Sequence, residues 1–259
     1  MSKPKILLLD LETSPILGHV WSLWENNVAL NQIQEDWHIL SWSAKFLDAK
    51  EIMYEDQRNS KNLNDERKLL KQIWYLLDQS DIVVGHNSKK FDIKKLNAKF
   101  IEYGMQPPSS FKQIDTLDIA KKHFAFSSNK LEYLCKKLDT KHKKLNHKKF
   151  PGHELWVECL KGNMEAWKEM EKYNKHDVLA LEDVYKKLLP WNSSINFSTY
   201  SDQTVCSCGS TDFTRNGFCY TSTGKYQRFS CRKCGAEVRN RQSLLSKDKK
   251  SSLKVPVNR

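Results

Sequence analysis

The stretch "ILLLDLETSP", Ile6 to Pro15, predicts the element on which the fold is built. Its four leading apolar residues are typical of a buried β-strand, and two carboxylates, Asp10 and Glu12, follow with one residue between them. Side chains alternate faces along a strand, so both carboxylates lie on one face, next to a core. Like charges there repel each other and lose hydration, so some other part of the chain must offset that cost.

The elements that follow occur in an order typical of an α/β layer fold. Strands are expected over residues 5–11, 19–24, 38–46, 81–85 and 111–115. A helix is expected over residues 64–80, where apolar residues recur at helical spacing, and another over 88–103, before the stop signals Gly104 and Pro107. Further helices are expected between 116 and 137 and over 162–189. A basic segment without apolar periodicity, residues 136–149, precedes the last helices.

Composition divides the chain into four parts, which we expect to be a main α/β domain, a linker rich in Asn, Ser and Thr, a cysteine module and a basic flexible tail. Their predicted limits are 1–189, 190–204, 205–243 and 244–259. The net charge of +12 is uneven, since residues 196–259 alone hold 12 Lys+Arg against 4 Asp+Glu. Such asymmetry suggests a polyanionic partner, most often nucleic acid; the alternative is a basic tail that only keeps the protein soluble.

Acidic residues recur in two later motifs. In "VVGHNSKKFD" (83–92), a strand is followed by a polar loop, and Asp92 opens a helix. In "YNKHDVLALEDVY" (173–185), Tyr173 and Asp177 are four residues apart and therefore share one helical face. Each has a structural alternative: Asp92 could be a first-turn acid favoured by the helix dipole, and Tyr173 could simply pack.

Together, the three acidic motifs resemble those of the DEDD family of 3′→5′ exonucleases, the DnaQ-like branch of the RNase H-like superfamily, over roughly residues 4–189. The resemblance implies an RNase H-like mixed sheet flanked by helices. Tyr173 stands four residues before Asp177, whereas position 172, where a catalytic histidine would fall, is Lys. The resemblance is therefore to the tyrosine subtype.

The resemblance also implies four metal-ligating carboxylates and a two-metal mechanism. Asp10, Glu12 and Asp177 would hold one Mg²⁺ or Mn²⁺ ion, Asp10 would also reach the second, and Asp92 would act on the second mainly through water. These cations take hard oxygen ligands, which would offset the repulsion in the first strand. Tyr173 would orient the attacking water, since a phenol of ordinary pKa, about 10, is a poor general base.

Substrate contacts are also implied by the resemblance. Leu11 and Thr13 would touch the terminal nucleotide, and Asn87 would lie near its sugar. The basic segment 136–149 could contact phosphates, or it could be a solvated loop.

Five of the seven cysteines lie between residues 206 and 234, and two turns in this module each end in Cys-Gly. Paired thiolates at such spacing suit tetrahedral Zn²⁺ in a structural site. The module resembles a zinc ribbon, although its first turn is Cys-x-Cys where the usual ribbon has Cys-x-x-Cys. The favoured ligands are Cys206, Cys208, Cys231 and Cys234, and Cys219 is the alternative to Cys206.

Basic and aromatic side chains are interleaved around these cysteines, a composition that suits phosphate contact and base stacking. In the alternative interpretation, the aromatic residues form a small core and the basic residues only solubilise it. A third interpretation is that the module forms a protein-docking surface.

The sequence and the resemblance therefore predict a metal-dependent 3′→5′ exonuclease, with DNA favoured over RNA and with the ribbon aiding nucleic-acid binding. It would act alone or join a replication or repair complex. The alternatives are an inactive nuclease fold that binds nucleic acid or protein, and a structure-specific endonuclease. No signal peptide or membrane span is expected, because Asp10 interrupts the first apolar stretch. We expect a cytoplasmic protein, and the resemblance is compatible with a bacterial cell or a phage-infected host.

Overall fold

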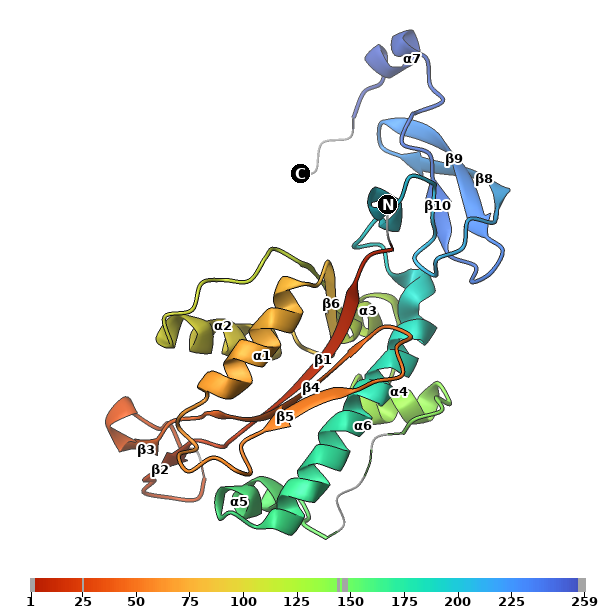
Figure 1. Cartoon of the computed structure of the whole chain (residues 1–259). Coiled ribbons are helices and arrows are strands. Elements are labelled where there is room, and N and C mark those ends of the chain that lie inside the picture. Colours follow the sequence, from red (N-terminus) through yellow and green to blue (C-terminus); the bar gives the residue numbers. More distant parts are fainter. Residues whose placement is uncertain (1–2, 25, 144, 146–148, 256–259) are drawn as a thin grey trace. The chain divides into compact units, whose positions relative to one another are not determined.

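The computed structural model describes residues 3–24, 26–143, 145 and 149–255, and the chain divides into two compact units. The larger unit comprises residues 4–185; the smaller comprises residues 186–259 together with the first three residues of the chain. Figure 1 labels the elements of both units. The predicted domain limits at residues 189 and 204 stay predictions.

A five-stranded mixed sheet lies at the centre of the larger unit, in the order β5-β4-β1-β6-β7 (Figure 1). β1 is parallel to β6, β6 is parallel to β7, and β4 is antiparallel to both β1 and β5. The strands are β1 (Ile6–Thr13), β4 (Ile39–Phe46), β5 (Met53–Asp56), β6 (Ile82–Gly85) and β7 (Lys112–Asp115). The predicted α/β fold with a mixed sheet flanked by helices is confirmed.

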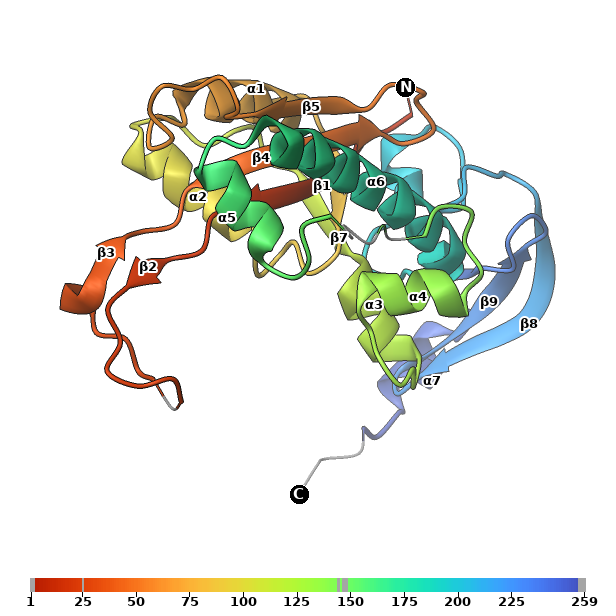
Figure 2. The same ribbon diagram turned by 90° about the horizontal axis from the view of Figure 1, so that it is seen from below.

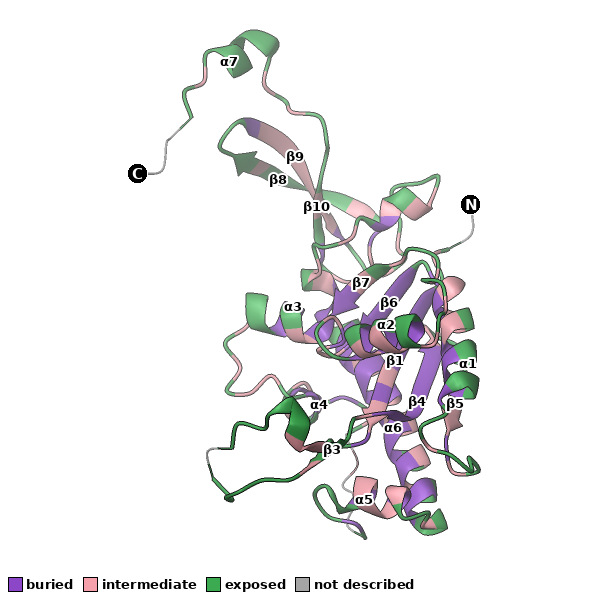
Figure 3. Ribbon diagram, turned by 90° about the vertical axis from the view of Figure 1, so that its left-hand side faces the viewer, coloured by how far each residue is buried: buried purple, intermediate pink, exposed green. Residues whose placement is uncertain are grey.

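Helices cover both faces of this sheet (Figure 2). The helices are α1 (Arg67–Asp78), α2 (Asp92–Glu102), α3 (Thr116–His123), α4 (Leu131–Lys137), α5 (Glu154–Leu160) and α6 (Met164–Leu188). Alternate residues of β1, among them Leu9 and Leu11, pack in one core with α1 and α2. Leu40 of β4 packs in another core with residues of α5 and α6. Figure 3 shows the central strands as largely buried.

A β-bulge interrupts the pairing of β1 with β4 near the carboxyl end of β1. Glu12 is opposite Ser41, but the next residue, Thr13, is opposite Ile39, so Leu40 is an extra residue on β4. A bulge re-aims the side chains beside it. Leu40 thereby reaches the core under α6, while Ile39 stays in the core under α1.

The prediction of a strand over residues 19–24 is wrong. Two short strands, β2 (Leu17–Gly18) and β3 (Ile33–Glu35), pair with each other outside the main sheet, and a short 3-10 turn, η1 (Leu30–Gln32), precedes β3. Residues 19–24 themselves form no strand, and the Trp21 side chain is 98% exposed. The apolar residues of this segment predicted a buried strand, but their side chains are exposed to solvent because the segment lies outside the layers of the fold. The prediction also missed β5 and α5.

The smaller unit contains a three-stranded sheet in the order β10-β9-β8. Its elements are η2 (Leu189–Trp191), η3 (Phe197–Tyr200), β8 (Phe213–Thr221), β9 (Gly224–Cys231), β10 (Glu237–Arg239) and α7 (Lys247–Ser251). The two 3-10 turns begin within or next to the predicted linker, and α7 lies in the predicted flexible tail. In the basic segment 136–149, residues 144 and 146–148 lie outside the described residues. Across the described ranges, the helices are all too short or too polar to cross a bilayer.

Candidate active site and cysteine cluster

Three of the predicted site residues meet at the carboxyl end of β1. One carboxylate oxygen from each of Asp10, Glu12 and Asp177 lies within 4.8 Å of the other two. The first two come from β1, and Asp177 comes from the middle of α6, where it is only 2% exposed. Three hard oxygen donors this close together fit a divalent cation such as Mg²⁺ or Mn²⁺.

Asp92 lies in the first turn of α2 and forms a hydrogen bond with the same strand, β1. Its Oδ1 accepts a hydrogen bond of 3.0 Å from the backbone N–H of Leu11, which lies between the two acids of β1. Its carboxylate is not one of the three that cluster within 4.8 Å. Burial and, to a smaller extent, the nearby carboxylate of Asp115 raise the pKa of Asp92 to about 7, against the opposing effect of its backbone hydrogen bonds.

The loop that delivers Asp92 is held by a second buried acid. Asp115 at the end of β7 accepts hydrogen bonds from the backbone N–H groups of Asn87 (2.8 Å) and Lys89 (3.2 Å). Asn87 adopts a left-handed backbone conformation with φ of 66°, which asparagine tolerates better than most residues. The structure places Asn87 in this turn. The contact of its side chain with a sugar stays a prediction.

Two neutral donors orient the acids of β1, and the sequence did not reveal either. The Asn174 Nδ2 donates to Asp10 Oδ2 at 2.6 Å, while Asn174 Oδ1 accepts from the hydroxyl of Ser41 at 3.2 Å. The indole N–H of Trp156 donates to Glu12 Oε2 at 2.9 Å. The spacing of Asn174, three residues before Asp177, could have placed it on the same helical face. Trp156 lies in α5, a helix that the sequence did not predict.

Tyr173 lies one turn before Asp177 on α6. Its side chain is 6% exposed, and its ring meets the ring of Trp156 edge-on, with centroids 5.9 Å apart. The adjacent His176 instead donates to the backbone carbonyl of Lys143 at 2.6 Å. Tyr173 and Trp156 thus pack together beside Glu12.

Leu11 and Thr13 lie in the strand that carries the first acids. The side chain of Leu11 is buried in the core with α1 and α2, and its backbone N–H donates to Asp92. Thr13 is half-buried at the bulge, opposite Ile39. Their contact with a terminal nucleotide stays a prediction.

The smaller unit brings four cysteines together. Sulfur atoms of Cys206, Cys208, Cys231 and Cys234 lie within 4.8 Å of one another. The separations are 3.5 Å between the Sγ atoms of Cys206 and Cys234, and 3.7 Å between those of Cys208 and Cys231. A tetrahedron with Zn–S bonds of about 2.3 Å places its sulfurs about 3.8 Å apart, so the donor set fits Zn²⁺.

Both cysteine turns are closed by a glycine in the left-handed conformation, with φ of 81° at Gly209 and 79° at Gly235. Their N–H groups donate to the carbonyls of Cys206 and Cys231, respectively. Burial raises the pKa of the Cys231 thiol, but hydrogen bonds from the N–H groups of Cys234 and Lys233 and from the thiols of Cys206 and Cys208 together outweigh this effect and lower the pKa to about 7. A thiolate is the form that binds metal.

Cys219 lies outside this cluster. It is half-buried on β8, where it pairs with Tyr226 of β9. The described residues therefore bring together the set that contains Cys206 rather than the alternative.

Comparisons with known proteins match parts of the chain. The sequence-family model described as "RNase_H superfamily" matches residues 34–189, a range that begins after the acids of β1. A segment of 78 residues, 30% of this chain, is 35% identical to "DNA polymerase III PolC-type" of Ureaplasma parvum. Among solved structures, the family B DNA polymerase of the archaeon Pyrobaculum calidifontis covers 73% of this chain with a TM-score of 0.51 and 14% identity, a likeness of fold alone. The matched parts span 5% and 25% of the two polymerases, respectively.

Proposed function

Because this chain belongs to the RNase H superfamily, we propose that it is a metal-dependent 3′→5′ exonuclease that hydrolyses nucleic acid, with DNA as the favoured substrate. One observation carries the proposal: Asp10 and Glu12 of β1 meet Asp177 of α6, with their oxygens within 4.8 Å. Asp177 lies more than 160 residues from the other two acids in sequence, so proximity along the chain does not explain their meeting.

The proposed cation ligands are Asp10, Glu12, Asp177 and, through water, Asp92. When bound, a pair of divalent cations in such a site activates a water nucleophile and stabilises the leaving oxygen. Other residues of this chain hold the proposed ligands in place. Asn174 and Trp156 orient Asp10 and Glu12 by hydrogen bonds, and Asp92 accepts a hydrogen bond from the backbone N–H of Leu11 in the same strand. The proposed role of Tyr173 is to orient the attacking water with its hydroxyl.

DNA is favoured because both polymerases that the chain resembles are DNA polymerases by name. A replication or repair complex is a proposed setting on the same ground. Since the chain matches only a small part of each, these remain proposals about substrate and partner.

The cysteine cluster is proposed to hold one structural Zn²⁺ and to fold a surface that binds nucleic acid. Phe218 and Tyr220 support this role because they are 40% and 68% exposed rather than packed in a small core. The ammonium of Lys225 lies 4.0 Å from the ring centroid of Phe218, and the guanidinium of Arg239 lies 3.9 Å from that of Tyr226. Aromatic faces beside cations suit base stacking and phosphate contact.

The test is the degradation of end-labelled single- and double-stranded DNA and RNA with Mg²⁺, Mn²⁺ or a chelator. Asp177→Asn is expected to abolish hydrolysis and to spare binding, because it removes a charged ligand and keeps the volume of the side chain. Glu169→Gln on the same helix is the matched control, since Glu169 lies outside the acidic cluster. Unchanged hydrolysis by Asp177→Asn in a contaminant-free preparation would refute the site.

A blocked 3′ terminus separates the proposed activity from its rivals. A 3′→5′ exonuclease stalls on such a substrate, whereas an endonuclease cuts inside it. Binding without hydrolysis under any metal condition would point instead to an inactive nuclease fold that acts as a binding module.

A further inference from the structure

A basic hollow lies on the larger unit, between the end of β5 and the start of α1. Its volume is about 530 Å³, and it is lined by residues between Ser60 and Lys71. Four of the lining side chains are cationic, and all four are exposed: Lys61, Arg67, Lys68 and Lys71. Neither the proposed chemistry nor the comparisons account for this hollow.

The register of the sheet places the start of this segment at the same end of the sheet as the acidic cluster, and the α1 residues of the hollow lie over the face opposite α6. Glu12 of β1 is opposite Ser41 of β4, and Ser41 is opposite Asp56 of β5. Neighbouring strands lie about 4.8 Å apart, so Asp56, the last residue of β5, lies about 10 Å from Glu12. The chain runs from Asp56 directly into the segment that lines the hollow.

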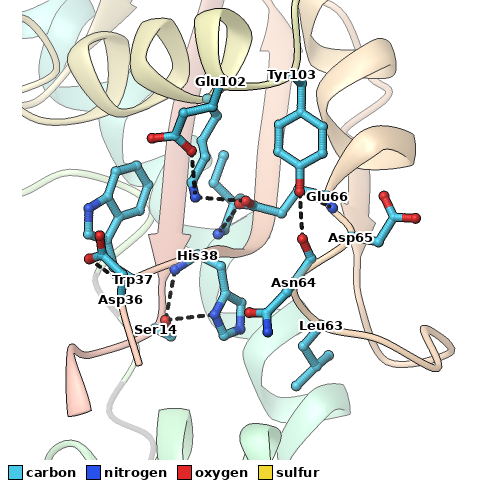
Figure 4. Close-up of polar contacts among 12 residues, drawn as sticks. Ser14, Asp36, Trp37, His38, Leu63, Asn64, Asp65, Glu66, Glu102 and Tyr103 are labelled. Atoms are coloured by element: carbon cyan, nitrogen blue, oxygen red, sulfur yellow. Dashed lines mark hydrogen bonds and ion pairs between the residues drawn. The ribbon is translucent and has the colours of Figure 1, made fainter. Parts of the chain in front are cut away.

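This segment is fixed to the sheet by a buried polar contact and to α2 by further ones (Figure 4). Glu66 accepts a hydrogen bond of 2.5 Å from the backbone N–H of Ile39, the residue opposite Thr13, and pairs with Lys99 at 2.9 Å. The Tyr103 hydroxyl accepts from the N–H of Glu66 at 3.1 Å and donates to the carbonyl of Asn64 at 2.5 Å. The basic side chains are therefore carried on a backbone that is preorganised relative to β1.

The charges around the hollow are only partly balanced. Lys68 pairs with Glu55 at 2.8 Å, and Arg67 pairs with Asp65 at 3.5 Å, both at the surface. Over the described ranges of the chain, Lys61 and Lys71 have no carboxylate within ion-pair distance. Exposed ion pairs contribute little, so an incoming phosphate can take the place of either acid at small cost.

We propose that the basic hollow binds the sugar–phosphate backbone of the strand whose 3′ end lies at the acidic cluster, a few nucleotides from the scissile bond. The inference rests on the proposed function and adds a binding site to it. Nucleic acid is the occupant because regularly spaced phosphates match several cations on a segment that starts at the same end of the sheet as the proposed phosphodiester-cleaving site, whereas an acidic polypeptide has no reason to lie at that end.

The experiment compares two variants that remove the same charge. Lys61→Gln/Lys71→Gln changes the hollow. Lys50→Gln/Lys112→Gln removes two lysines that are also exposed, at the opposite end of the sheet, one in the β4–β5 turn and one at the start of β7. Both are made in an Asp177→Asn background, and binding to oligonucleotides of about 4, 8 and 16 nucleotides is measured over a range of salt concentrations.

The hollow variant is expected to bind the longer oligonucleotides roughly threefold to tenfold more weakly at 0.1 M salt, with a loss that grows with length. Its slope of log K against log salt should be shallower by about 1.4, since each phosphate contact on a single strand contributes about 0.7. The control variant is expected to match the parent protein. Equal losses in both variants, or competition by polyglutamate as strong as by an oligonucleotide of equal charge, would overturn the inference.

Failure of this inference is distinguishable from failure of the proposed function. If wild-type protein hydrolyses nucleic acid and the hollow variant binds it unchanged, the hollow is not a binding site and the exonuclease proposal stands. If wild-type protein neither binds nor hydrolyses DNA or RNA, both proposals are wrong.

Discussion

At the scale of single residues, the orientation of Asp10 depends on a fully buried amide. Asn174 receives a hydrogen bond from Ser41 through its oxygen and donates to Asp10 through its nitrogen, so each end of the amide is fixed. Partners of this kind hold a ligating carboxylate in one rotamer and tune its affinity for metal. Under the proposed function, Ser41 and Asn174 are therefore positioning residues that act through Asp10.

Asn174→Leu is expected to lower hydrolysis by about tenfold to 100-fold and to raise the Mg²⁺ or Mn²⁺ concentration that gives half-maximal activity. The reason is that Leu fills a similar volume and offers no donor to Asp10. Metal titrations of the rate measure the shift, which a loss of folded protein alone would not produce.

Ser41 and Ser43 provide a matched pair for this network. Both are buried on β4, but within the described structure the Ser43 hydroxyl has no hydrogen-bond partner, whereas Ser41 donates to Asn174. Ser41→Ala should therefore shift the metal titration in the same direction as Asn174→Leu, by less, and Ser43→Ala should leave it in place. A shift of equal size in both serine variants would contradict the network.

At the scale of elements, Asp92 reaches the site through a tight connection between β6 and α2. Gly85 ends β6, and a Cβ atom built there would overlap the side chain of Ser88, which is buried. Asp115 of β7 holds the same connection through backbone N–H groups. The carboxylate of Asp92 thus depends on the close packing of a strand end, a turn and a neighbouring strand.

Gly85→Ala is expected to destabilise the larger unit by about 1–3 kcal/mol, the range for overpacking a tight site, and to reduce hydrolysis because the connection must move. Ser88→Gly removes the colliding atoms. The double variant should therefore lose less free energy of unfolding than the sum of the two single variants. Urea denaturation followed by tryptophan fluorescence measures the three values, and strict additivity would show that the clash is not the cause.

At the scale of the whole molecule, the two units are stabilised in different ways. The larger has extensive apolar cores on both faces of its sheet. The core of the smaller unit around the cysteines consists mainly of Cys206, Cys231 and Ala236, with few apolar partners. A segment with so little buried apolar surface needs a metal or another cross-link to fold.

Removal of zinc is therefore expected to unfold the cysteine module and to leave residues 4–185 folded. The purified protein should contain one Zn²⁺ per chain, and a strong chelator should release it, free the four thiols and open residues 205–243 to proteolysis. Circular dichroism should retain the helical signal of the larger unit. Loss of the helical signal together with the zinc would contradict the independence of the two units.

Single cysteine variants extend this prediction. Cys206→Ser should lose the stoichiometric zinc, and Cys219→Ser should keep it, because Cys219 lies on β8 outside the sulfur cluster. The reverse result would assign the fourth ligand to Cys219.

The sequence predicted much of the fold from local patterns. Apolar residues of α1, such as Leu70, Ile73 and Leu77, recur at helical spacing and are buried as expected. The prediction failed over residues 19–24, where apolar side chains are exposed. It also missed β5, in which every residue is half-buried. Burial depends on which elements come to lie nearby, and local composition does not determine that.

The candidate metal ligands of this protein follow from local sequence patterns: an acidic pair that the strand period places on one face, an acid on a helix, and cysteines in two glycine-closed turns. These follow from the periods of strand and helix and from the chemistry of carboxylates and thiolates. Which of these ligands meet depends on the folded chain, as do the hydrogen bonds from Asn174 and Trp156 to the acids and the place of a basic segment after Asp56 at the same end of the sheet. Strand pairing and helix packing join residues that are distant in sequence, so these contacts are properties of the assembled layers rather than of any short segment.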